Sequence, residues 1–132
     1  ILVIDAQHEC LNGETSAVFT AEGMQGCICM YRMQSEEVRP IHVLLHELGH
    51  LLHIKVTGTL TEIPKSFVGH LLSLGIECSK LTAAQLQELF ADTFMLAVIN
   101  KHPELGVPEP NFSAKTLAHC YKYICTLFDS MR

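Results

Sequence analysis

The segment IHVLLHELGHLLHIKV, residues 41–56, decides the fold expected for this chain. Its leucines and other aliphatic residues predict a buried helix, but histidines and a glutamate interrupt the apolar run. Polar groups in an apolar helix cost free energy unless a partner satisfies them. The segment therefore raises the question of what satisfies His46, Glu47 and His50.

The spacing of these three residues favours a metal ion. His46 and His50 are four residues apart, so on a helix they project from one face, roughly 6 Å apart at Cβ. Two imidazoles at that separation can bind one Zn²⁺ at ~2.0–2.1 Å each. Glu47 is then placed to act as a general base on a zinc-bound water. A catalytic zinc needs one further protein ligand and an open position for water, so we expect a third ligand downstream.

A glutamate on a later helix is the best candidate for that ligand. The third histidine of the metzincin continuation is absent, because the corresponding glycine and histidine positions hold His53 and Val56. The segment ELFAD, residues 88–92, instead has the Glu-x-x-Ala-Asp form of the gluzincins. If Glu88 binds zinc, Asp92 lies one turn later and can accept a hydrogen bond from a ligand imidazole.

These motifs resemble the ImmA/IrrE family of small zinc peptidases over roughly residues 26–99. The resemblance rests on VLLHELGHLLH after a β-strand and on a downstream helix carrying Glu-x-x-Ala-Asp-x-Phe. It implies a zincin-like fold and an endopeptidase, commonly one that cleaves helix-turn-helix repressors in bacteria and mobile elements. Family members often have an acidic residue next to the alanine of the second motif, where this chain has Phe90. Zinc would then be held by His46, His50 and Glu88, with Glu47 passing the water's proton to the leaving amine.

The order of predicted elements is strands first, then helices, which indicates an α+β fold in a single domain, residues 1–132. We expect a small N-terminal β-sheet, a hairpin plus an additional strand, packed against three to four helices. The helices are expected at about 36–55, at 65–74, after a Thr82–Gln85 capping box, and after Ser113. On the last helix the residues expected to face the core are Leu117, Tyr121, Ile124 and Phe128.

Composition narrows the class of protein. Apolar residues make up 48% of the chain, yet no run approaches the ~18–20 residues that span a bilayer, so we expect a soluble protein. The pattern of cysteines favours a cytoplasmic one. The net charge of -5, without a cluster of Lys and Arg, argues against direct nucleic-acid binding. The six cysteines include no Cys-x-x-Cys pair and are expected to be reduced thiols. The expected partner is a protein or peptide substrate, with the strand Cys27–Met33 as an edge for β-augmentation.

Other interpretations remain open. A catalytically inactive zinc-binding interaction or sensor module would use the same ligands, although Glu47 favours an enzyme. A helical interaction domain with a coincidental motif would bind no metal, and histidine and carboxylate ligands also suit iron, cobalt or nickel. His53 is expected to be a satisfied helix-end histidine, with a supporting role behind the ligands as the alternative. The side chains expected to be solvated or capping are His8, His42, His70 and His102.

Overall fold

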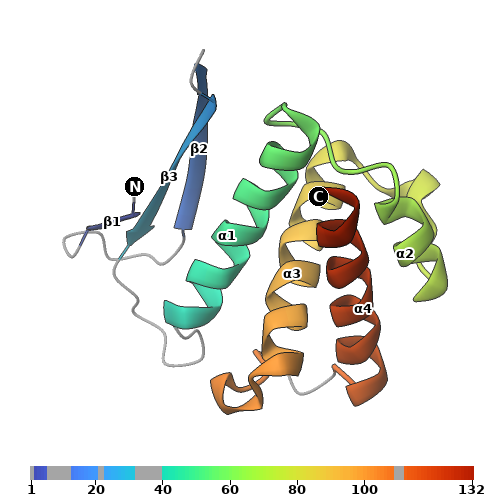
Figure 1. Ribbon diagram of the computed structural model, residues 1–132. Helices are drawn as coiled ribbons and strands as arrows, with labels where there is room; N and C mark the ends of the chain where they lie inside the picture. The colour runs from blue at the N-terminus through green and yellow to red at the C-terminus, as the bar shows by residue number, and fades with distance from the viewer. Residues whose placement is uncertain (1, 6–12, 21–22, 32–39, 109–111) are drawn as a thin grey trace.

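The computed structural model describes residues 2–5, 13–20, 23–31, 40–108 and 112–132. Most of this part of the chain is helical (Figure 1). The strands are β1 (Leu2–Asp5), β2 (Gly13–Thr20) and β3 (Gly23–Tyr31). The helices are α1 (Pro40–Thr57), α2 (Phe67–Ser73), α3 (Ala83–Lys101) and α4 (Ala114–Ser130). Two short 3₁₀ segments, η1 (Cys78–Lys80) and η2 (Pro103–Leu105), lie before and after α3.

The three strands pair in the order β1-β3-β2. β2 and β3 are antiparallel, with Thr20 opposite Gly23, and β1 runs parallel to β3. Ile28, Cys29 and Met30 have strand partners on both sides. The prediction that Cys27–Met33 offers an edge to a peptide is therefore wrong for these residues, because β3 is the central strand; residues 32 and 33 lie outside the described part.

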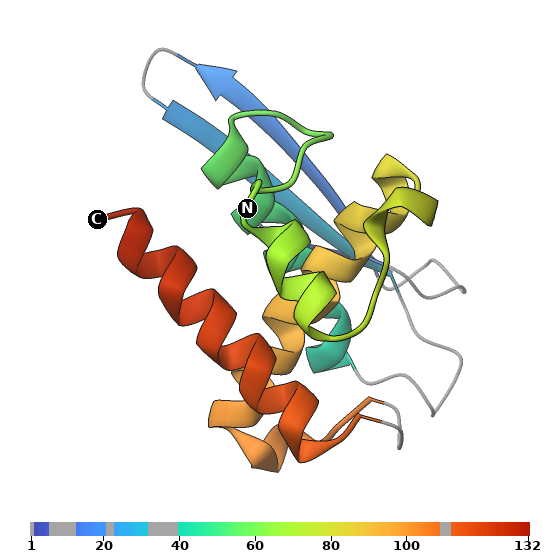
Figure 2. The same cartoon turned by 90° about the vertical axis from the view of Figure 1, so that its right-hand side faces the viewer.

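Helix α1 lies between the strands and the other helices (Figures 1 and 2). It contacts β2 and β3 on one side and α3 on the other, and for this reason more than one of its faces is apolar. On the strand side Gly26 of β3 lies directly against Leu51, where a side chain on the glycine would collide. The histidines and the glutamate of the motif are thus carried by a helix that is covered on two sides.

The predicted starts of the last two helices, α3 and α4, are confirmed by their capping side chains. The Thr82 hydroxyl accepts from the Gln85 N–H, and the Gln85 side chain accepts from the Thr82 N–H, which completes the capping box of α3. The Ser113 hydroxyl accepts from the Thr116 N–H at the start of α4. These contacts fix where α3 begins, and with it the position of Glu88 in the second turn.

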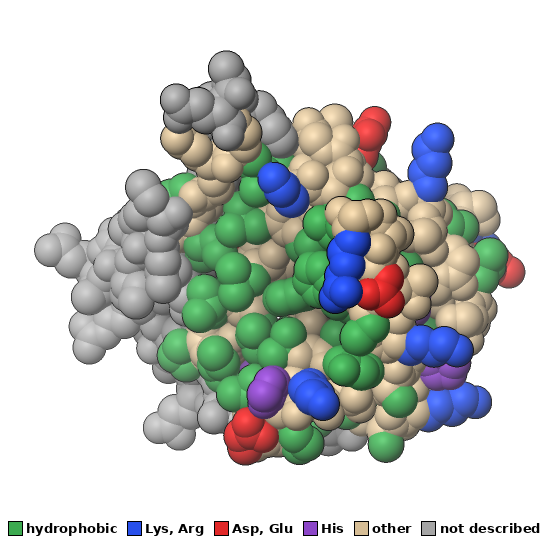
Figure 3. Space-filling view, in the orientation of Figure 1, with side chains coloured by type: hydrophobic (Ala, Val, Ile, Leu, Met, Phe, Trp, Pro, Cys, Tyr) green, Lys and Arg blue, Asp and Glu red, His purple; other side chains and the backbone are tan. Residues whose placement is uncertain are grey.

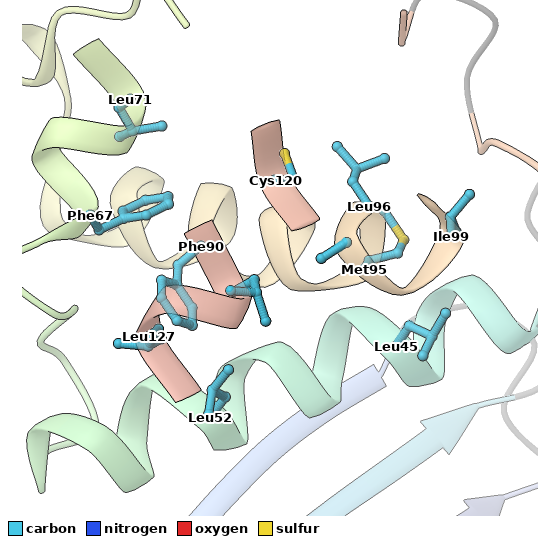
Figure 4. Close-up of a cluster of buried hydrophobic side chains, with 12 residues drawn as sticks. Leu45, Leu52, Phe67, Leu71, Phe90, Met95, Leu96, Ile99, Cys120 and Leu127 are labelled. Atoms are coloured by element: carbon cyan, nitrogen blue, oxygen red, sulfur yellow. The ribbon is translucent and has the colours of Figure 1, made fainter. Parts of the chain in front are cut away.

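A hydrophobic core joins all four helices (Figure 4). Phe67 of α2 and Phe90 of α3 are fully buried and meet edge to face, with ring centroids 5.1 Å apart. Ile124 of α4 is buried as predicted, but Phe128 is 41% exposed. Leu117 and Tyr121 are half-buried and pack against the core, as predicted. Cys120 and Leu127 are buried in it as well, because α4 is turned so that the neighbouring stripe of its surface faces α3.

The described surface carries apolar side chains over the helices in the view of Figure 3. No helix in the described ranges has the combination of length and apolar character that crossing a membrane requires. Among the cysteines that the structure describes, Cys78, Cys120 and Cys125 form no disulfide.

Candidate metal centre

Helix α1 brings the three motif residues together. One ligand atom each of His46, Glu47 and His50 lies within 4.8 Å of the other two, so this group could hold a metal ion. The Nε2 atoms of His46 and His50 are 3.2 Å apart, and their rings meet edge to face. Glu47 is buried, whereas both imidazoles are half-buried. The i, i+4 spacing read from the sequence therefore does place both histidines on one face of a helix.

Helix α3 places two carboxylates beside the imidazoles of His46 and His50. Glu88 bridges the imidazoles, with Oε2 at 2.8 Å from His46 Nε2 and Oε1 at 3.1 Å from His50 Nε2. Asp92 lies one turn later, and its Oδ1 is 2.8 Å from His46 Nδ1. All the residues predicted for the site, including Glu88 and Asp92 from a distant part of the sequence, thus lie side by side where α1 meets α3.

A glycine allows this close meeting of the helices. A Cβ atom built on Gly49 would lie 2.6 Å from Cα and 2.8 Å from the carbonyl oxygen of Ala91. Because both are backbone atoms, no rotation of a side chain could relieve the overlap. Gly49 lies between His46 and His50 in sequence, and Ala91 lies between Glu88 and Asp92. The helices are therefore in backbone contact at the position that joins the two halves of the site.

A chain of hydrogen bonds orients His50. The Nδ1–H of His53 donates to the Glu62 carbonyl at 2.9 Å, and the Nε2 of His53 lies 3.0 Å from His50 Nδ1. Burial lowers the pKa of His53 to about 4, so this ring is neutral and its Nε2 must accept. His50 consequently donates through Nδ1 and turns the lone pair of Nε2 towards His46 and Glu88.

His53 is thus more than a helix-end histidine. Its side chain is only 1% exposed, and the alternative considered from the sequence, a supporting role behind the ligands, describes its contacts better. The i, i+3 spacing from His50 was the available signal. The hydrogen bond from His53 to the Glu62 carbonyl could not be predicted, because it involves a backbone group between α1 and α2.

His46 is oriented by Asp92 in the same way. Burial lowers the pKa of His46, but the hydrogen bond to Asp92 and the charges of Asp92, Glu88 and Glu47 outweigh burial and raise it above 6.5. The pKa of His50 is lowered, first by burial and then by the positive charge of His46. Asp92 accepts from Nδ1–H of His46, which leaves Nε2 directed at Glu88.

This donor set fits a divalent metal. The Nε2 atoms of both imidazoles lie within 3.1 Å of the Glu88 carboxylate, and contacts this short need a proton or a cation between the atoms. In a tetrahedral site with bonds of ~2.0–2.1 Å, neighbouring ligand atoms are about 3.3 Å apart. The observed separations are 3.2 Å between the Nε2 atoms and 2.8 and 3.1 Å to Glu88, so the side chains need to spread by up to about 0.5 Å to receive an ion.

The predictions that His42 and His70 are solvated or capping residues are wrong. His42 is buried, not solvated, and its Nε2 lies within hydrogen-bonding distance of the carbonyl oxygens of Leu105 and Gly106. His70 is also buried, stacked on Tyr123 with centroids 4.8 Å apart. His102 is exposed at the C-terminal cap of α3, as expected, and His8 lies outside the described residues.

Comparisons of the chain with protein-family models, with curated protein sequences and with solved structures found no match. The resemblance to the ImmA/IrrE family therefore rests on the motif residues and on nothing wider. The group formed by His46, Glu47 and His50 on one helix, which could hold a metal ion, does not depend on that resemblance.

Proposed function

We propose that this chain is a zinc-dependent endopeptidase with a zincin-like arrangement of its active-site helices. The observation that carries the proposal is the meeting of the His46 and His50 Nε2 atoms with the Glu88 carboxylate, next to the buried carboxylate of Glu47. Two imidazoles, one carboxylate and an adjacent acid–base residue are the components of a glutamate-type zinc hydrolase.

Each side chain has a separate task in this proposal. His46, His50 and Glu88 would hold the ion, and Asp92 and His53 would keep the two imidazoles in the tautomer that offers Nε2. Glu88 is the better third ligand than Glu47, because its two oxygens already lie beside both Nε2 atoms. Glu47 is thereby left for proton transfer.

The chemistry follows from these positions. Bound zinc would supply Lewis acidity, which polarises the scissile carbonyl and makes a water molecule a nucleophile near neutral pH. Glu47 would take a proton from that water and deliver it to the amine that leaves. Because Glu47 is buried, its carboxylate is shielded from competing solvent. The side chains of Glu88 and Asp92 are 61% and 41% exposed, so the substrate would approach from the α3 side of the site.

The substrate would be a regulatory protein, a helix-turn-helix repressor being the kind that the ImmA/IrrE resemblance suggests. Recognition of DNA would then belong to the substrate. The acidic balance of this chain, 14 acidic against 9 basic residues, is consistent with that division.

The first test is the metal content of protein purified without added metal or chelator, measured by elemental mass spectrometry. About one zinc per chain is expected. Glu47→Gln should keep that zinc and abolish cleavage of a peptide library, whereas Glu88→Ala should lose zinc affinity. Zinc binding without any cleavage by the wild type would favour the inactive interaction or sensor module. Absence of metal, even after incubation with zinc, would refute both.

A further inference from the structure

The surface beside Glu88 is hollowed. A depression of about 380 Å³ lies along the first turns of α3, at the lower end of the size range of ligand pockets. The residues that line it are Leu81, Ala84, Gln85, Glu88 and Leu89. Its walls are therefore apolar except at Glu88 and at the amide of Gln85.

The walls of this depression are held in place. Leu81 and Leu89 are half-buried and pack against the hydrophobic core, so they cannot swing into the space. The amide oxygen of Gln85 accepts from the Thr82 N–H in the capping box, which ties this side chain to the start of α3. Ala84, one turn before Glu88, is exposed and small, so the space above it stays open. The depression is shallow and open to solvent, and these contacts fix its shape.

The depression adjoins the candidate metal centre at Glu88. Glu88 forms one of its walls, and the carboxylate of the same residue lies 2.8 Å from His46 and 3.1 Å from His50. A peptide whose carbonyl lies at the metal centre would therefore place a neighbouring side chain at the mouth of this hollow. A charged side chain would have to give up water against Leu81 and Leu89 to enter it.

We propose that this hollow is a specificity subsite that receives a large aliphatic or aromatic side chain next to the scissile bond. The inference rests on the proposed peptidase function and adds the class of substrate: peptides with an apolar residue flanking the cleaved bond. Ala84 is the specificity-determining position, because its size sets how much of the hollow is free.

Cleavage of a random peptide library by the zinc-loaded protein, with products sequenced by mass spectrometry, tests the subsite. For the wild type we expect Leu, Met or Phe at one position flanking the cleaved bond, favoured over Ala by roughly 10-fold or more. Ala84→Leu fills the hollow and keeps a good helix former, so the preference should shift to Gly and Ala. Ala118→Leu, also an exposed alanine in a helix but on α4, is the matched control and should keep the wild-type profile.

A binding measurement separates the subsite from catalysis. Calorimetric titration of zinc-loaded Glu47→Gln with leucine hydroxamate and glycine hydroxamate should show tighter binding of the leucine compound, and Ala84→Leu in this background should remove the difference. Cleavage without an apolar preference, or with one that Ala84→Leu leaves unchanged, overturns the subsite and leaves the peptidase standing. If nothing is cleaved, the peptidase proposal fails and the hydroxamate pair decides alone: equal binding, or none, overturns the subsite.

Discussion

Replacing Gly49 by alanine should separate the two halves of the candidate site. The added Cβ would lie 2.6 Å from Ala91 Cα, whereas ordinary contact begins at 3.4 Å, so the helices must part by about 0.8 Å at this point. Metal–ligand distances tolerate only about ±0.2 Å, so Glu88 would no longer reach an ion held by the histidines of α1. We expect zinc affinity to fall at least about 10-fold.

The same substitution should destabilise the protein although alanine is the better helix former. Overpacking costs about 1–3 kcal/mol, more than the ~1 kcal/mol gained from helix propensity. Gly69 of α2 provides the control, because a Cβ there would meet nothing within 4 Å. Gly69→Ala should therefore stabilise slightly and leave zinc affinity unchanged. Urea unfolding of the metal-free proteins and chelator competition measure the two effects, and wild-type stability and affinity in Gly49→Ala would refute the argument.

Three further predictions concern the histidines and the helix start. His53→Leu should weaken zinc binding by about 10–100-fold, whereas His53→Gln, whose amide can both donate and accept, should stay within about threefold in chelator competition; equal losses would contradict the hydrogen-bond chain to His50. Burial lowers the pKa of His70 from 6.5 to about 4, so the unfolded chain binds a proton that the folded chain refuses. The free energy of unfolding should therefore fall as the pH drops from 6.5 towards 4, and urea titrations should show a weaker pH dependence for His70→Phe. Thr82→Ala should cost about 1 kcal/mol in the same assay, and an unchanged midpoint would mean that the capping box with Gln85 adds nothing to stability.

The site residues could be predicted because their spacing is local. His46 and His50 are one turn apart, and so are Glu88 and Asp92, so each pair shares a helix face whatever the tertiary structure. The pairing of the two helices was predicted from the need of a zinc ion for a third ligand, together with the resemblance of residues 88–92 to the gluzincin motif. The role of Gly49 in that pairing depends on the approach of α3 and could not be predicted from α1 alone.

Features that depend on distant partners were missed. The central position of β3 follows from its parallel pairing with β1, which no local pattern specifies. On α4 the predicted stripe and the observed one both contain Ile124 and differ by a small rotation, too small for apolar spacing to resolve when Cys120 is as buried as a leucine. His42 and His70 were misjudged because their enclosing partners, a pair of backbone carbonyls and a tyrosine ring, are far away in sequence.

The division of the proposed ligands between α1 and α3 would tie metal binding to folding. Neither helix alone carries all three proposed ligands, because His46 and His50 are on one and Glu88 is on the other. An unfolded chain must close a loop of 37 residues, those between His50 and Glu88 (88 − 50 − 1), before the set is complete. Free zinc at 100 times its dissociation constant would then add about 2.7 kcal/mol to the stability of the folded chain. Cellular zinc supply would thereby change the unfolded fraction of this protein about 100-fold, and a shortage would increase its exposure to proteolysis even where its activity is not needed.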